Sequence, residues 1–199
     1  MSHRIILASG SDIRAALLRN AGVTFDVEVP RIDEPAIRSS MQAEGASPQD
    51  IADVLAEHKA RKIALKHSEA FVIGCDQVLD FGGRTLSKPV DPDDAKAQLR
   101  AMSGQRHSLL SAAVIWNEGA PVWRFVGQVR LQMRPVSDDY IDDYVIRNWD
   151  SIRHAVGCYK LEEEGVRLFS HIDRDYFTVL GLPLVELLCY LTRRGALQG

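Results

Sequence analysis

A carboxylate and a lysine lie on the two arms of a predicted β-hairpin, where together they could bind a metal ion and phosphate. The stretch from residue 72 to residue 89, VIGCDQVLDFGGRTLSKP, opens with an apolar run typical of a buried strand and then presents Asp76. The pair Gly82-Gly83 predicts a turn, and Lys88 returns on the second arm. Carboxylates are ligands for divalent cations, and a lysine ammonium binds phosphate oxygens. The local pattern also fits an ordinary hairpin with solvated polar residues, and both interpretations stay open at this level.

The amino-terminal segment predicts a second anion site. Residues 4–8 form a short apolar strand, a turn of small residues follows, and residues 13–21 show apolar positions at helical spacing. Ser11 or Asp12 can cap this helix. The free N–H groups and positive dipole end of the helix favour an anion above the strand, and Arg14 adds a charge suited to phosphate. A simple cap beside a surface arginine is the structural alternative.

Two further segments carry charges that could complete such a site. The adjacent carboxylates Asp33 and Glu34 follow a second predicted strand, residues 24–29, and can hold a divalent cation if that strand ends beside the first. They would otherwise be ordinary surface residues. A basic helix is predicted over residues 48–66, and it includes Lys59. Most of its cations are expected in solvent, but one could face an anion.

The remaining elements predict the fold class. Residues 105–116 and 122–135 are expected to form a long antiparallel pair of strands, and residues 37–47 a mobile connection. Further elements are expected as helices at 94–102, 137–147 and 184–194 and as a strand at 166–172. About seven strands and five helices in mixed order predict an α/β or α+β domain with a mixed sheet, without strict βαβ alternation.

Composition excludes several classes of protein. The chain has 199 residues, a net charge of -3 and a hydrophobic fraction of 46%, which are typical of one globular domain or two tightly joined lobes. This charge gives no indication of a nucleic-acid or membrane-surface binder. No run approaches the roughly 18 apolar residues that span a bilayer, and the start lacks an extended apolar signal core. We therefore expect a cytoplasmic protein.

The three cysteines do not predict a disulfide framework or a zinc site. Cys75, Cys158 and Cys189 are widely spaced and form no CxxC pair. Cys75 is next to the candidate carboxylate, but no base accompanies it at short range. A small buried side chain is therefore preferred to a nucleophile at this position.

Four segments in order resemble the Maf-like nucleoside triphosphate pyrophosphatases. They are LASGSDIRAALLRNAG followed by IDE, GCDQVL followed by LSKP, AKAQLRAMSGQRHSLLSA, and YFTVLGLPL. The resemblance covers residues 7–191, and the order and intervals of the four motifs make it specific. It implies an elongated α/β fold with a long curved mixed sheet and two lobes around a cleft, with residues 1–199 as a single domain that is commonly a homodimer.

The resemblance also implies an activity and roles for the matching residues. The expected reaction is hydrolysis of a nucleoside triphosphate to a monophosphate and pyrophosphate, with Mg²⁺ or Mn²⁺ as cofactor. Glu34 and Asp76 would work with the metal and the attacking water, and Asp76 is the expected general base. Lys59 and Lys88, the other two expected catalytic residues, would hold the phosphate chain and stabilise the charge that develops on the leaving pyrophosphate. Ser9 and Arg14 would contact phosphates. Phosphoanhydride hydrolysis requires a general base and several cations, which these residues supply, and it does not require a covalent nucleophile.

Two positions bear on the nucleotide base. Gln77 and Glu162 match the family branch that acts on 7-methyl-GTP, whereas the branch that prefers dTTP and UTP tends to have Thr and Gln there. A carboxylate can accept hydrogen bonds from a purine N1–H and exocyclic amine together. Glu163 and Glu164 are alternative matches, and Asp12 and Ile13 depart from the family pattern. The alternatives are a dTTP/UTP pyrophosphatase, an inosine triphosphate pyrophosphatase, or a non-catalytic nucleotide-binding regulator of septum formation.

Overall fold

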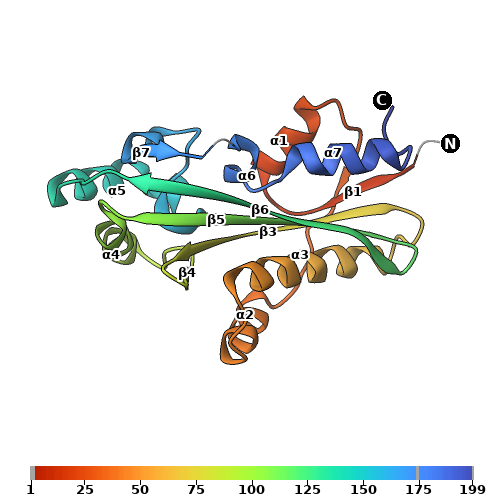
Figure 1. Cartoon of the computed structure of the whole chain (residues 1–199), viewed down its shortest axis with the longest axis horizontal. Helices are drawn as coiled ribbons and strands as arrows, with labels where there is room; N and C mark the ends of the chain where they lie inside the picture. The colour runs from red at the N-terminus through yellow and green to blue at the C-terminus, as the bar shows by residue number, and fades with distance from the viewer. Residues whose placement is uncertain (1–2, 174, 199) are drawn as a thin grey trace.

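A computed structural model describes residues 3–173 and 175–198, and it contains one open seven-stranded sheet (Figure 1). The strand order is β2-β1-β3-β5-β6-β7, with β4 paired to β3. β1 is parallel to β2 and β3, and the other pairs are antiparallel, so the predicted mixed sheet is confirmed. The strands are β1 (Ile5–Ala8), β2 (Asp26–Val27), β3 (Phe71–Phe81), β4 (Arg84–Leu86), β5 (Arg106–Asn117), β6 (Ala120–Met133) and β7 (Phe169–Ile172).

Helices cover both faces of the sheet, as Figure 1 shows. The helices are α1 (Asp12–Asn20), α2 (Glu34–Ala43), α3 (Pro48–Ala64), α4 (Pro92–Met102), α5 (Asp138–Ile152), α6 (Tyr176–Val179) and α7 (Leu184–Arg193), with 3₁₀ turns η1 (Val156–Cys158) and η2 (Glu164–Leu168). α3 packs on one face of β1 and β3, whereas α1 and α7 pack on the other. α4 and α5 build a separate core at the far end of the long strands.

The alternation of side chains along β3 sends neighbouring residues to opposite faces of the sheet. Ile73 and Cys75 belong to the core with α1 and α7, whereas Val72 and Val78 pack against α3. Asp76 has the same parity as Val72 and Val78, so the strand directs its carboxylate toward α3. This parity positions the candidate base.

The largest difference from the predicted elements is α2. We expected residues 37–47 to be a mobile connection, but residues 34–43 form a helix. Asp33 caps it by accepting a hydrogen bond from the backbone N–H of Ala36 at 3.0 Å, and Pro35 fits the first turn. Only Ile37 and Met41 of its apolar residues pack against the core, so the apolar stripe was too short to predict.

Other boundaries also differ from expectation. β2 is two residues long rather than six, and β3 continues to Phe81 instead of ending before Asp76. α5 continues to Ile152 instead of ending at residue 147, and the short helix α6 was not predicted. Cys189 is exposed.

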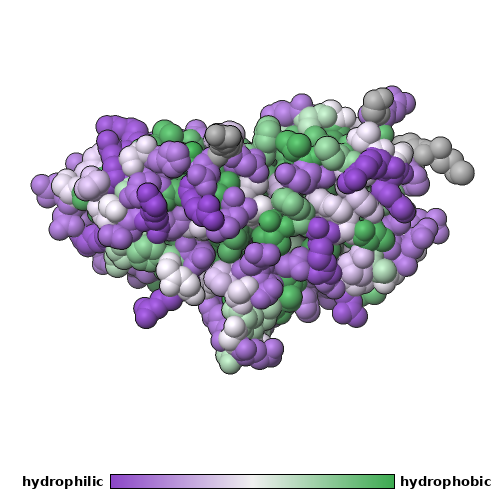
Figure 2. Space-filling model, viewed as in Figure 1, coloured by the Kyte–Doolittle hydropathy of each residue, from purple (hydrophilic) through white to green (hydrophobic). Residues whose placement is uncertain are grey.

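On the face drawn in Figure 2, hydrophilic side chains cover both ends of the molecule, and hydrophobic ones gather nearer the middle and over α7. In the part of the chain that the structure describes, no helix has the length and apolar character needed to cross a bilayer.

Candidate active site

The candidate site lies at a gap in the edge of β3. β1 pairs with β3 only as far as Gly74, and β4 pairs with the same edge only from Leu79 onward. Residues 75–78 therefore have a strand partner on the β5 side only. An open pocket of about 1140 Å³ lies at this gap, with residues that follow β1 and β4 in its walls. The ends of two strands thus bring the two predicted anion sites to one place.

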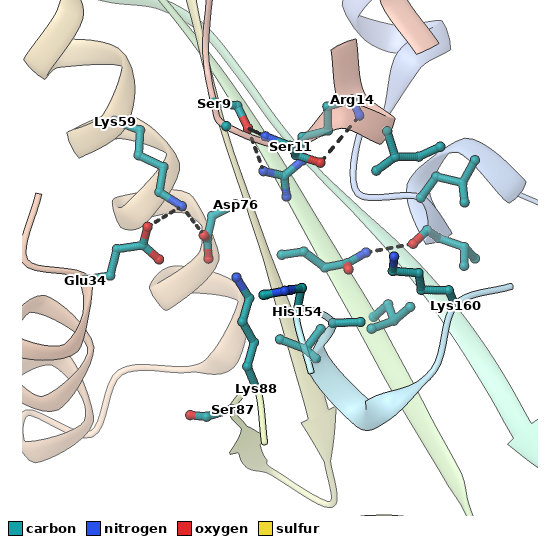
Figure 3. Close-up of a pocket in the computed structure, with 18 of the residues that line it drawn as sticks. Ser9, Ser11, Arg14, Glu34, Lys59, Asp76, Ser87, Lys88, His154 and Lys160 are labelled. Carbon is teal, nitrogen blue, oxygen red and sulfur yellow. Dashed lines mark hydrogen bonds and ion pairs between the residues drawn. The ribbon is translucent and has the colours of Figure 1, made fainter. Parts of the chain in front are cut away.

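Asp76, Lys59 and Glu34 form a charge cluster in which Asp76 and Lys59 are buried and Glu34 is partly exposed (Figure 3). Nζ of Lys59 donates to Oδ1 of Asp76 at 2.6 Å and lies 3.0 Å from Oε1 of Glu34. Asp76 and Lys59 are only 5% and 8% exposed. The structure therefore brings together three of the four residues that we expected to be catalytic, on β3, α3 and α2.

Gly74 makes this cluster possible because it lets α3 approach β3 closely. A Cβ atom at residue 74 would lie 2.1 Å from the carbonyl oxygen of Ala56 and 2.5 Å from the backbone nitrogen of Ala60. Ala60 is the neighbour of Lys59 on α3, and Gly74 lies two residues before Asp76 on β3. Because Gly74 has no side chain, α3 lies close enough to β3 for Lys59 to contact Asp76.

The two carboxylates suit a divalent cation. Within the described residues, Oδ2 of Asp76 is buried and has no hydrogen-bond partner, while Glu34 is partly exposed to the pocket. No group of three His, Cys, Asp or Glu side chains that could hold a metal is present in residues 3–173 and 175–198. Two carboxylates with further oxygens from water and phosphate are the ligand set that Mg²⁺ commonly has in phosphate-binding sites. The residues present therefore fit the expected cofactor.

Ser9 and Arg14 lie together at the other wall of the pocket, but Arg14 is held largely by main chain. Its Nε donates to the carbonyl oxygen of Gly181 at 2.8 Å, and its Nη1 donates to that of Cys75 at 3.1 Å. Oγ of Ser9 accepts from Nη1 of Arg14 at 3.4 Å and from the backbone N–H of Ser11 at 3.2 Å. The guanidinium thus fastens α1 and the segment after α6 to the open edge of β3.

Lys88 completes the predicted set from the opposite side. It follows β4, lines the pocket, and in Figure 3 its ammonium points into the space beside Asp76. No carboxylate of the described residues lies within ion-pair distance of it. This cation is therefore available to an anionic ligand.

Gln77 lies on the opposite face of β3 from Asp76, and its amide is anchored. Nε2 donates to Oγ of Ser111 at 2.9 Å, and the carbonyl oxygens of Thr178 and Val179 lie 3.2 and 2.9 Å away. The amide nitrogen is thus committed to β5 and α6. Its carbonyl oxygen is the group left for a ligand in the pocket.

The three consecutive glutamates have different environments. Glu163 accepts hydrogen bonds from Ser151 at 2.6 and 2.8 Å. Glu164 accepts from Arg147 at 2.7 Å and from Asn148 at 2.9 Å, and these hydrogen bonds lower the pKa of its carboxyl. Glu162 lines the pocket, and no side chain in the described part of the chain bonds to it. Of the three alternatives, the geometry favours Glu162 as a ligand group.

Cys75 does not have the environment of a nucleophile. Its side chain is completely buried, and burial raises the pKa of the thiol to about 11. The thiol is therefore protonated near neutral pH. The expectation of a small buried side chain at this position is confirmed.

His107, the histidine of the third motif, contacts a residue of the pocket wall. Its Nε2 is 2.8 Å from the hydroxyl of Tyr159, whose side chain lines the pocket, and the two rings pack together with Phe169. Burial lowers the pKa of His107 to about 4, so the imidazole is neutral. This histidine supports the pocket wall.

The sequence did not predict two of the cations that line the pocket: Lys160, which pairs with Glu163, and Arg38. Arg38 lies on α2 one turn after Glu34, and its Nη2 is 3.8 Å from Oδ2 of Asp76. Its spacing of four residues from Glu34 is the signal that could have identified it, once a helix over this segment was recognised.

Comparison with known proteins places this architecture in one family. Residues 4–194 match the family of Maf-like proteins. The chain is 65% identical over 198 residues to the nucleoside triphosphate pyrophosphatase of Ruegeria pomeroyi, with both chains fully covered. It is 44% identical over 198 residues to the 7-methyl-GTP pyrophosphatase of Rhizobium meliloti, again with full coverage of both.

A solved structure of a dITP/XTP pyrophosphatase from Mycobacterium abscessus is also similar. It is 20% identical, covers 67% of this chain and 75% of its own, and has a TM-score of 0.37. The family match spans nearly the whole chain and includes every element around the pocket. This chain belongs to the Maf family.

Proposed function

We propose that this protein is a nucleoside triphosphate pyrophosphatase, which hydrolyses the bond between the α and β phosphates. The observation that carries the proposal is the cluster of the buried Asp76 and Lys59 with Glu34, in a pocket that Lys88 also lines. A general base beside several cations is the arrangement that phosphoanhydride hydrolysis requires. The names of the relatives from Ruegeria and Rhizobium support the same activity.

In this proposal Asp76 is the general base. Its Oδ1 is held by Lys59, while Oδ2 has no partner among the described residues and can accept a proton from the attacking water. The water oxygen bonds to phosphorus as the anhydride P–O bond breaks, and the electron pair of that bond leaves with pyrophosphate. Lys88 stabilises the charge that develops on the leaving group, and Lys59 fixes the orientation of the base.

We further propose that Glu34 and Asp76 hold a divalent cation, Mg²⁺ or Mn²⁺. The bound ion would neutralise phosphate charge and favour ionisation of a nearby water. Because Lys59 already bridges both carboxylates, this site is expected to bind the cation more tightly with nucleotide than without it. Ser9 and the first turn of α1 would contact phosphate, with Arg14 fixing their position.

The proposed substrate is 7-methyl-GTP. Glu162 lines the pocket, and no described side chain bonds to its carboxylate. Gln77 lines the same pocket, and because its amide nitrogen is engaged, its carbonyl oxygen is the group left for a ligand. Both groups accept hydrogen bonds, which matches the N1–H and amine donors of guanine, and methylation at N7 adds a positive charge that a carboxylate favours. The relative from Rhizobium meliloti at 44% identity, which is named for this substrate, supports the assignment.

Three organisational features rest on the sequence and on the family resemblance. We propose a single domain over residues 1–199, a homodimer in solution and a cytoplasmic location. Light scattering coupled to gel filtration measures the molar mass, and a mass of one chain would contradict the dimer.

A nucleotide panel tests the proposed function. Pyrophosphate release is measured with 7-methyl-GTP, dTTP, UTP, CTP and ITP, each with Mg²⁺ and with a chelator. We expect release that requires the metal and is fastest with 7-methyl-GTP. Preference for dTTP and UTP would support the other branch, and preference for ITP would support an inosine triphosphate pyrophosphatase. No release from any nucleotide would favour a non-catalytic binding protein.

A further inference from the structure

The guanidinium group of Arg38 lines the pocket, and one of its hydrogen-bond donors has no acceptor among the described residues. The side chain lies on α2 and is 18% exposed, and its Nη1 is buried with no hydrogen-bond partner among the described residues. Its Nη2 lies 3.8 Å from Oδ2 of Asp76, which also has no partner there. This distance permits charge attraction but exceeds that of a hydrogen bond. A buried donor and acceptor that remain unpaired call for an explanation.

The helix that carries Arg38 is anchored in place. Glu34, Arg38 and Gln42 recur every four residues and line the pocket, so they lie along one face of α2. At the end of this row, Nε2 of Gln42 donates to Oγ1 of Thr85 on β4 at 2.7 Å. Ile37 and Met41, each one residue before a member of this row, pack against the core along the adjacent face of the helix. The helix that carries the guanidinium is therefore held at the pocket by its packing on the core and by the contact of Gln42 with β4.

The cations of the pocket differ in how many hydrogen bonds and ion pairs they already make within the protein. Lys59 is shared between Asp76 and Glu34, and Arg14 donates to two main-chain carbonyl oxygens. Arg38 retains a buried donor that no described residue accepts, and Lys88 lines the pocket without an ion pair to a described carboxylate. They approach from α2 and β4, respectively, and both line the pocket that Asp76 enters. A polyphosphate between them would be contacted from two sides.

We propose that Arg38 is a substrate-binding residue that donates hydrogen bonds to phosphate oxygens of the polyphosphate tail. The inference rests on the proposed function, because it assigns a ligand to the same pocket. A guanidinium presents a planar fork of donors that suits two phosphate oxygens at once. One phosphate group would satisfy the unpaired donor of Arg38, and Lys59 would continue to hold Asp76.

Titration with inorganic tripolyphosphate tests the assignment without turnover. The proteins are wild type, Arg38→Gln, Arg38→Lys and the control Arg61→Gln, and isothermal calorimetry gives each Kd. Arg61 is a suitable control because it lies on the same side of the sheet, on α3, over the ring of Trp116 and outside this pocket. We expect Arg38→Gln to raise the Kd roughly tenfold to a hundredfold, the range of a charged hydrogen bond. Arg38→Lys should fall between wild type and Arg38→Gln, and Arg61→Gln should stay within twofold of wild type.

The proposal is overturned if the Kd of Arg38→Gln stays within twofold of wild type, or if wild type does not bind tripolyphosphate. The first result would leave Arg38 as only a counter-ion of Asp76, which affects stability but not phosphate affinity. If Arg38→Gln does not fold, a Kd for Arg38→Lys equal to that of wild type overturns the proposal. A protein that hydrolyses no nucleotide yet binds tripolyphosphate through Arg38 would contradict the proposed function and keep this inference. If the protein releases pyrophosphate but its Kd for tripolyphosphate does not depend on Arg38, this inference is contradicted and the proposed function is kept.

Discussion

The ammonium nitrogen of Lys59 lies 2.6 Å from Oδ1 of Asp76, and less than a tenth of each residue is exposed. The pair joins α3 to β3 at the gap between β1 and β4. A buried charge is costly unless it is paired, so this contact supports both the fold and the site.

Removing one partner of the pair should therefore destabilise the protein. We expect Lys59→Met to lower the free energy of unfolding by about 3 kcal/mol, because Asp76 loses the hydrogen bond that holds its Oδ1. Urea unfolding followed by circular dichroism measures the change. The double variant Lys59→Met/Asp76→Asn should lose less than the sum of the two single variants, since the buried charge is then removed. Strict additivity would contradict the pairing.

Gly74→Ala should separate α3 from β3. The added methyl group would overlap main-chain atoms of Ala56 and Ala60, which cannot move aside as a side chain can. We expect a loss of about 3 kcal/mol in the free energy of unfolding, together with loss of pyrophosphatase activity. Gly83→Ala is a control for glycine replacement, since no atom lies within 4 Å of a Cβ there, although its positive φ adds some strain. If Gly74→Ala is no more destabilising than the control, the close approach does not set the geometry of the site.

Glu162→Gln should change selectivity for the base. Loss of the carboxylate removes a charged acceptor for guanine, so kcat/KM for 7-methyl-GTP should fall roughly tenfold to a hundredfold. The value for UTP should change much less, because uracil does not present the same pair of donors. Glu163→Gln is the matched control, because that carboxylate is already bonded to Ser151. Equal losses on both nucleotides would count against a role in reading the base.

Stability at mildly acidic pH should depend on His107. Burial lowers the pKa of His107 from 6.5 to about 4 in the folded state, so the unfolded chain binds a proton at higher pH than the folded chain does. The contribution to stability is complete above pH 6.5 and decreases as the pH falls toward 4, by about 1.4 kcal/mol per pH unit at most.

A neutral replacement isolates this effect. His107→Gln keeps a group able to bond Tyr159 but does not titrate. The free energy of unfolding, measured from pH 7 to pH 4, should fall more steeply for wild type than for His107→Gln. Parallel curves would show that His107 does not cause the dependence.

Much of the site could be predicted from the sequence because its chemistry is local. Asp76 follows an apolar strand, Ser11 caps a helix, and Lys88 follows a glycine turn, and each pattern is visible within a few residues. The mixed sheet followed from the order of helices and strands, and the long antiparallel pair β5 and β6 followed from two extended runs joined by a turn.

Features that depend on distant contacts could not be predicted in this way. α2 has no buried residue and a short apolar stripe, so its polar sequence looked like a loop, and Arg38 was missed with it. The amide nitrogen of Gln77 donates to main-chain carbonyl oxygens about a hundred residues later in the sequence, and these belong to α6, a helix that was not predicted. The choice among three glutamates depended on Arg147 and Ser151, which bond two of them and leave Glu162 to the pocket.

The most direct test of the central claim is product analysis by ³¹P NMR with 7-methyl-GTP and Mg²⁺. Wild type should convert the triphosphate signals into those of a monophosphate and pyrophosphate in equal amounts. Asp76→Asn should slow this conversion by at least about a hundredfold, because the general base is lost. Orthophosphate and a nucleoside diphosphate as products, or undiminished turnover by Asp76→Asn, would contradict the account.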